Sequence, residues 1–203
     1  MRLRILAMAL ALCLCLGACA MVSTSKSDST VPANGISISS EQVSMDSDTI
    51  DTAESYLRLM ESLLGTSWDT PSDIPIYKLV HWYAYQFDEA ERQKYVIDGK
   101  DGLYFPENEF EEKMAKYFGL SSDYLRSSSE CYSEEEHTYR TISALGPLSE
   151  KVYEIIDISD NNSITSIEFK IHYIEIDEVA ENILNLTYTD DGVQFLSYSY
   201  NCK

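Results

Sequence analysis

Few side chains in this sequence have the chemistry of a catalytic or metal-binding site. The three histidines are His81, His137 and His172, and none stands in an HxxxH, HExxH or Cys-x-x-Cys setting that would bring metal ligands together. Each is interpreted as a residue of the surface or of the core margin. No phosphate-cradling glycine loop occurs either. The sequence therefore predicts no metal ion and no cofactor.

Carboxylates are the most abundant groups that could act as an acid or base. Glu134-Glu135-Glu136 has the charge to gather Ca²⁺ but is interpreted as a solvated turn. Asp160-Asn161-Asn162 lacks the Gly and terminal Glu of an EF-hand loop and is interpreted as a hairpin turn. A buried carboxylate beside a tyrosine would make a general base, but 15 tyrosines and 34 acidic residues make such pairs too easy to form for the sequence to select one.

Two aromatic residues, Trp82 and Tyr85, fall beside the apolar face of a predicted helix rather than on it. At the margin of a core, an indole or a phenol keeps one polar end in water. The alternative is that both rings stack on a ligand. They are therefore the candidate ligand-stacking residues.

Cys131 and Cys202 are the only cysteines after residue 19. Outside the cytoplasm two thiols can form a disulfide, which here would join the segment entering the predicted sheet to the end of its last strand. Spacing alone does not decide between this disulfide and two free thiols.

The N-terminus has the pattern of an export signal. Arg2 and Arg4 precede an uncharged run from Ile5 to Leu16, which is too short for a spanning helix of about 20 residues. Leu16-Gly17-Ala18-Cys19 follows, with a leucine, two small residues and a cysteine. This stretch resembles the lipobox of bacterial lipoproteins, with the difference that Ala or Ser is commoner than Gly17.

The resemblance implies that residues 1–18 are a signal peptide and that Cys19 is lipidated and becomes the mature N-terminus. Each buried methylene of an acyl chain contributes about 0.8 kcal/mol, so two or more chains hold a protein firmly on the cell membrane. The predicted location is the extracytoplasmic face, with membrane lipid as the partner of acylated Cys19. An ordinary cleaved secretory signal is the alternative. Residues 19–45, rich in Ser, Thr, Asp and Asn, would form a flexible tether.

The charge of the chain excludes several partners. It has 15 basic and 34 acidic residues and a formal net charge of −19. Nucleic-acid binding depends on clustered Lys and Arg, and no such cluster occurs. The same lack of clustered Lys and Arg argues against electrostatic docking on an anionic membrane leaflet, so attachment would depend on the acyl chains of Cys19. We interpret the acidity as a source of solubility and of repulsion from the envelope.

Residues 46–203 are predicted to form a single domain that begins with helices. Turn-forming Asp98-Gly99 and Asp101-Gly102 predict a small hairpin or an ordered loop between two of them. The expected helices are one from Asp48 to Leu64 that ends at Gly65, a second capped by Asp73 with Pro75 in its first turn, and a third with an Asn108-x-x-Glu111 capping box that ends at Gly119.

From His137 onward the apolar period shifts from near 3.6 to 2, which predicts strands. Short turns between them indicate an antiparallel meander. In the longest strand Ile167, Phe169 and Ile171 alternate with polar residues, so one face should be covered and one wet. The expected strands are Thr138–Ser143, Val152–Ile158, Ile164–Ile176, Ile183–Thr189 and Val193–Tyr200.

Helices first and strands afterwards predict an α+β fold, with N-terminal helices packed on a curved antiparallel sheet of four to five strands. By element order alone, over roughly Ile50 to Tyr200, this resembles the NTF2-like and cystatin-like cones found among small lipoproteins of Gram-positive bacteria. The resemblance implies a concavity for small molecules or peptides and carries no catalytic residues with it.

Three functions remain open. The leading hypothesis is a non-catalytic, membrane-anchored binding domain for a small ligand, a glycan, a peptide or a protein partner. A hydrolase or isomerase with a carboxylate-tyrosine site in an NTF2-like cavity is the alternative, and a deep pocket around a desolvated Asp or Glu would favour it. A structural accessory to a larger envelope complex is the third, which an extended apolar patch would support.

Overall fold

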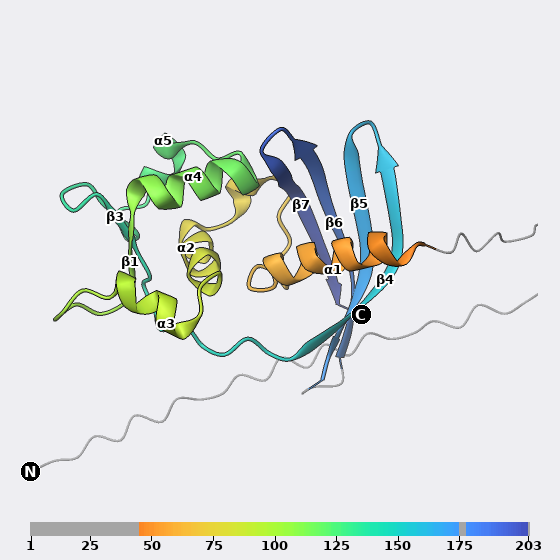
Figure 1. Cartoon of the computed structure of the whole chain (residues 1–203), viewed down its shortest axis with the longest axis horizontal. Helices are drawn as coiled ribbons and strands as arrows, with labels where there is room; N and C mark the ends of the chain where they lie inside the picture. Colours follow the sequence, from red (N-terminus) through yellow and green to blue (C-terminus); the bar gives the residue numbers. More distant parts are fainter. Residues whose placement is uncertain (1–44, 175–177, 203) are drawn as a thin grey trace, which may run out of the picture. The chain divides into compact units, whose positions relative to one another are not determined.

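The computed structural model describes residues 45–174 and 178–202, and it has an α+β fold (Figure 1). The described residues form one compact unit. The predicted signal peptide, lipidated Cys19 and the tether up to residue 44 lie outside the described residues.

The described helices come almost entirely before the main sheet, as the sequence predicts. The α-helices are α1 (Ser47–Met60), α2 (Ile76–Tyr85), α3 (Glu89–Arg92), α4 (Glu107–Phe118) and α5 (Ser122–Arg126), with short 3₁₀ helices at Pro71–Asp73 and Gln93–Tyr95. The strands are β1 (Tyr104–Pro106), β2 (Tyr132–Ser133), β3 (Thr138–Arg140), β4 (Lys151–Asn161), β5 (Ile164–Tyr173), β6 (Glu178–Thr189) and β7 (Gly192–Cys202).

The main sheet is an antiparallel meander in the order β4-β5-β6-β7, as predicted. Along β5, Ile167, Phe169 and Ile171 are buried while Glu168 between them is exposed, which confirms the predicted alternation. Helix α1 covers the buried face and presents Ala53, Leu57 and Met60 to the core (Figure 1).

The first predicted strand does not join this meander. Only Thr138–Arg140 is extended, and as β3 it lies between β1 and β2 in a separate three-stranded antiparallel sheet. Phe105 stands opposite Tyr139, whose ring centroid lies 4.4 Å from that of Phe110 in α4. Aromatic packing against the helices therefore holds this strand in the helical half of the domain.

Two predicted helix starts are wrong, and proline is the reason in both cases. Asp73 closes a capping box with Thr70 around the 3₁₀ turn, whereas α2 begins at Ile76 with Pro75 as its N-cap. Likewise the predicted capping box at Asn108-x-x-Glu111 does not begin a helix. Helix α4 begins at Glu107, directly after Pro106, and has no side-chain cap. Proline fixes φ near the helical value and has no N–H to satisfy, so it begins a helix without a capping hydroxyl or carboxylate.

The predicted glycine stops agree better with the structure. Gly119 is the left-handed C-cap of α4 at φ +64°. Helix α1 ends earlier than predicted, at Met60, and the turn that follows it reaches Gly65 at φ +107°. The Asp98–Gly102 segment is an ordered loop rather than a hairpin, because β1 pairs with β3 instead.

Candidate functional site

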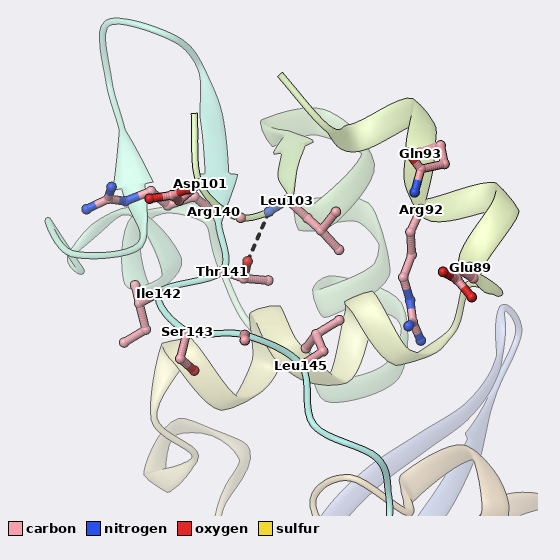
Figure 2. A pocket seen from close by; sticks show the side chains of 12 residues that line it. Glu89, Arg92, Gln93, Asp101, Leu103, Arg140, Thr141, Ile142, Ser143 and Leu145 are labelled. Carbon is pink, nitrogen blue, oxygen red and sulfur yellow. Dashed lines mark hydrogen bonds between the residues drawn. The ribbon is translucent and has the colours of Figure 1, made fainter. Parts of the chain in front are cut away.

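A cavity of about 580 Å³ lies between α3, the loop before β1 and the chain after β3 (Figure 2). We call residues 141–150, which connect β3 to β4, the strap, and this space the strap cavity. Its lining comes from three segments that are far apart in the sequence. They contribute Glu89, Arg92 and Gln93 from α3 and the turn after it, Asp101, Gly102 and Leu103 from the loop, and residues 140–145 from β3 and the strap.

The loop and the strap are joined by a close backbone contact at Gly102. The Leu103 N–H donates to Thr141 Oγ1 and the Thr141 N–H donates to Leu103 O, both at 3.0 Å. Gly102 has φ +96°, and a Cβ there would lie 2.8 Å from Thr141 O. Glycine is therefore required at this position for both its conformation and its size.

The strap is also attached to α2. The Tyr85 hydroxyl donates to Gly146 O at 2.7 Å. The Arg92 guanidinium lies over the face of the same ring, 5.6 Å from its centroid. Tyr85 thus links the strap to one wall of the cavity.

The lining combines apolar and charged groups. Leu103 and Leu145 lie in the middle of the view in Figure 2 and pack partly against the core, while Ile142 is exposed. Arg92 Nε donates to Ala84 O at 3.0 Å and Arg140 Nε donates to Glu130 O at 3.1 Å, so backbone carbonyls fix the direction of both side chains. Apolar walls with a few oriented polar groups are typical of ligand pockets.

His81 meets the strap at Ser143. Its Nε2 lies 3.4 Å from Ser143 Oγ, and burial lowers the pKa of the imidazole. Within the described part of the chain His81 has no carboxylate hydrogen-bond partner, and its ring packs edge-on against Tyr77 instead. Because no third group orients the imidazole, the pair lacks the geometry of an activated nucleophile.

Trp82 is not available to a ligand, so the predicted stacking role is wrong for this residue. The side chain is 0% exposed, and its Nε1 donates to Leu59 O at 2.7 Å. Phe118 and Tyr117 pack edge-on against the indole at centroid distances of 5.0 and 5.5 Å. Trp82 is a core residue, whereas Tyr85 stays beside the strap cavity.

The fold brings carboxylates and tyrosines together, but as an ion-paired network. Glu111 is 8% exposed and accepts hydrogen bonds from Arg126 Nε at 2.7 Å, Arg126 Nη2 at 2.8 Å and Tyr139 Oη at 2.8 Å. Burial alone raises the pKa of Glu111, but the hydrogen bonds from Arg126, Ser122 and Tyr139 outweigh it and the pKa is lowered.

Glu107 extends this network to the surface. It accepts from Tyr132 Oη at 2.7 Å and lies 3.1 Å from His137 Nδ1, and the Tyr132 hydrogen bond is the largest cause of its lowered pKa. A general base needs a pKa near the working pH. Both carboxylates instead remain ionised, which fits a structural role better than catalysis.

The remaining polar candidates lie apart from the strap cavity. His172 Nε2 lies 3.1 Å from Glu154 Oε2 on the solvent-exposed face of the main sheet. Glu136 pairs with Lys100, and Asp160 accepts a hydrogen bond from Thr165. Over residues 45–174 and 178–202 no group of three or more His, Cys, Asp or Glu side chains is placed to hold a metal ion.

Cys131 is buried and is bonded to no cysteine whose side chain the structure describes, and burial raises the pKa of its thiol. The backbone of Cys202 ends β7, but its side chain lies outside the described residues, so the disulfide stays a prediction. Among the helices that the structure describes, none is long and apolar enough to cross a membrane.

No protein-family model matches the chain, and none of the curated proteins or solved structures compared with it matches. Apart from Tyr85 at its edge, the strap cavity uses none of the predicted site residues, because its lining comes from segments that the sequence marks only as turns and connections.

Proposed function

We propose that this protein is a lipid-anchored lipoprotein of the extracytoplasmic face of the cell membrane, whose domain binds a small amphipathic ligand in the strap cavity without catalysing a reaction. The observation that carries the binding part is the cavity itself, which is lined by Leu103 and Leu145 and by Arg92 and Arg140, whose side chains are hydrogen-bonded to backbone carbonyls. The lipobox at Cys19 carries the anchoring part.

The size and composition of the cavity favour a small molecule. A volume of about 580 Å³ lies within the range of about 300 to 1,000 Å³ that is usual for ligand pockets. Leu103, Ile142 and Leu145 offer contact to an apolar body. The lining also contains the charged residues Arg92, Arg140, Glu89 and Asp101. The polar end of the ligand can therefore meet hydrogen-bond donors or acceptors.

A hydrolase or isomerase is the weaker proposal. It needs a carboxylate with a raised pKa beside a cavity, whereas the pKa values of Glu107 and Glu111 are lowered. Both carboxylates are hydrogen-bonded to tyrosine hydroxyls in a way that holds them ionised. These contacts favour binding over chemistry.

Binding is tested on the purified full chain with a library of amphipathic metabolites, by following the unfolding temperature. We expect hits that Leu145→Glu abolishes and Leu148→Glu leaves intact. Both leucines are on the strap, but only Leu145 lines the cavity, and Leu148 is exposed. Equal loss in both variants, or hits that neither changes, would contradict binding in this cavity.

Anchoring is tested separately by replacing Cys19 with serine and fractionating cells. We expect the wild-type chain in the membrane fraction and Cys19→Ser in the soluble or secreted fraction. Unchanged membrane retention of the variant would contradict lipidation at this residue and would leave the binding result untouched.

A further inference from the structure

A second cavity, of about 340 Å³, lies between α1 and the core-facing side of β4, β5 and β6. We call it the α1 groove. Its floor is formed by Ala53, Thr165 and Ile167, all of them buried. The floor of the groove therefore belongs to the hydrophobic core, whereas its rim is formed by the exposed residues Asp48, Thr49, Thr52, Asp160 and Tyr188.

One wall of the α1 groove is aromatic. Tyr56 of α1 and Tyr188 at the end of β6 stand 6.4 Å apart between ring centroids with 57° between their planes. Tyr56 is held from behind by Phe195, which meets it edge-on at 6.3 Å. Tyr188 is 57% exposed, so a large ring face is open toward solvent beside the groove. Burial raises the pKa of Tyr56 to about 12, which keeps its phenol neutral.

The charged lining of the α1 groove is entirely acidic. Asp48 and Asp160 line it, and its described lining contains neither lysine nor arginine. Asp48 lies in the first turn of α1, where a carboxylate also interacts favourably with the helix dipole. Asp160 accepts a hydrogen bond from the buried Thr165 hydroxyl through Oδ1, and it is the carboxylate of this lining that stands on the sheet.

The register of the sheet determines where Asp160 stands. Along β4 and β5, Ile158 stands opposite Ile167 and Asp160 stands opposite Thr165. Ile167 and Thr165 are both buried, so Asp160 occupies a position on the core-facing row of β4. Asp160 thus places an exposed carboxylate at the end of this row, beside the Thr165 hydroxyl from which it accepts a hydrogen bond.

We propose that the α1 groove binds a small organic cation, an ammonium group on an apolar or aromatic body. The ammonium lies against the faces of Tyr56 and Tyr188 and near the Asp160 carboxylate, while the apolar body covers Ala53 and Ile167. Cation–π contact of this kind contributes about 0.5 to 2 kcal/mol. The net charge of −19 also raises the local concentration of cations around the domain.

The experiment uses 2-phenylethylammonium as the probe and 2-phenylethanol as its neutral counterpart, with ligand-observed NMR on the purified full chain. We expect the ammonium to bind more tightly than the alcohol. Tyr188→Leu keeps an apolar side chain and removes the ring, and should weaken binding by about 2- to 30-fold. Asp160→Asn should weaken it by about 5-fold, the size of one solvent-accessible ion pair.

Asp157→Asn is the matched control, because Asp157 stands opposite Glu168 on the other face of the same strand. It removes the same charge from the chain and should leave binding unchanged. Tyr188→Phe keeps the ring and should bind as the wild type does, which separates loss of the ring from loss of the hydroxyl. Equal affinity for the ammonium and the alcohol, equal loss in Asp157→Asn and Asp160→Asn, or competition by CaCl₂ at the same concentration would overturn the proposal.

Discussion

The Glu111 network and the strap cavity use the same residue types in opposite ways. Around Glu111, the Arg126 guanidinium and the Tyr139 hydroxyl are hydrogen-bonded to one buried carboxylate. Around the strap cavity, Arg92 and Arg140 are hydrogen-bonded to backbone carbonyls and stand beside an open space.

This difference distinguishes residues that stabilise the fold from residues that are available to a ligand. A buried polar group must be paired to avoid a large desolvation cost, so a fully paired network contributes to the fold. Arginines that donate one hydrogen bond to a backbone carbonyl retain further donors for a ligand. We call the hydrophobic core together with the Glu111 network the closed region. Changes there should therefore affect unfolding, and changes around the strap should affect binding first.

Trp82→Ala should give the largest effect, because it empties the centre of the closed region. Removing a fully buried aromatic side chain costs about 3 to 5 kcal/mol of unfolding free energy, and the hydrogen bond to Leu59 O is lost as well. Urea unfolding measures this cost. Leu145→Ala beside the strap cavity is the comparison and should cost about 1 kcal/mol, since that side chain is only partly buried. Similar costs for the two would break the proposed distinction.

Glu111→Ala should cost about 3 kcal/mol, because it leaves the Tyr139 hydroxyl and the Arg126 guanidinium without their carboxylate. Glu112→Ala, one residue later and exposed, is the matched control and should stay within about 0.5 kcal/mol. Equal urea midpoints for both variants would show that the network adds nothing to stability.

Acid should weaken the same network. The pKa of Glu111 is lowered in the folded state, so its contribution is complete above the unfolded pKa of about 4.3 and is lost as the pH falls through the folded value. Glu107 acts in the same direction. The urea midpoint of the wild type should therefore fall below about pH 5, and the fall should be smaller in Glu111→Gln. Parallel curves for the two proteins would exclude this carboxylate as a cause.

Gly102→Ala tests the backbone contact that joins the loop to the strap. A Cβ would meet Thr141 O at 2.8 Å and the residue would keep φ +96°, so we expect a loss of about 2 kcal/mol together with weaker ligand binding. Gly99→Ala has φ +79° and open space around its Cβ, and should cost about 1 kcal/mol. Gly146→Ala has open space and an ordinary φ, and should be close to neutral. An equal loss of unfolding free energy in Gly99→Ala and Gly102→Ala would mean that the close contact between Gly102 and Thr141 does not contribute to stability.

The main sheet could be predicted because its information is local. The alternation within β5 and the short turns between neighbouring strands determine the pairing without any distant partner. The small sheet could not, because Phe105 pairs with Tyr139 from a distant part of the chain through strands of two or three residues. Short segments of this kind have too few residues to show a period.

The strap cavity could not be predicted either, for a related reason. Leu103 and Thr141 meet only after the helices have packed, and neither has chemistry that marks it in advance. The sequence signal nearest to this contact is Asp101-Gly102, which by itself predicts only a turn or a loop. In the same way, the burial of Trp82 depends on Leu59, Tyr117 and Phe118, which come from other elements. A position beside the apolar face of a helix does not show what another segment will place over it.

Tyr85→Phe gives the smallest effect and asks whether the strap cavity is formed before a ligand arrives. The change removes the hydrogen bond to Gly146 O and keeps the ring under Arg92. One hydrogen bond contributes about 0.5 to 1.5 kcal/mol, and Tyr85 is only half-buried, so global stability should change by less than about 1 kcal/mol. Amide hydrogen exchange in the strap should instead become up to about 5-fold faster, with the main sheet unchanged. If exchange in the strap and in the main sheet rose together, the strap would be part of the closed region and not a separate ligand-binding element.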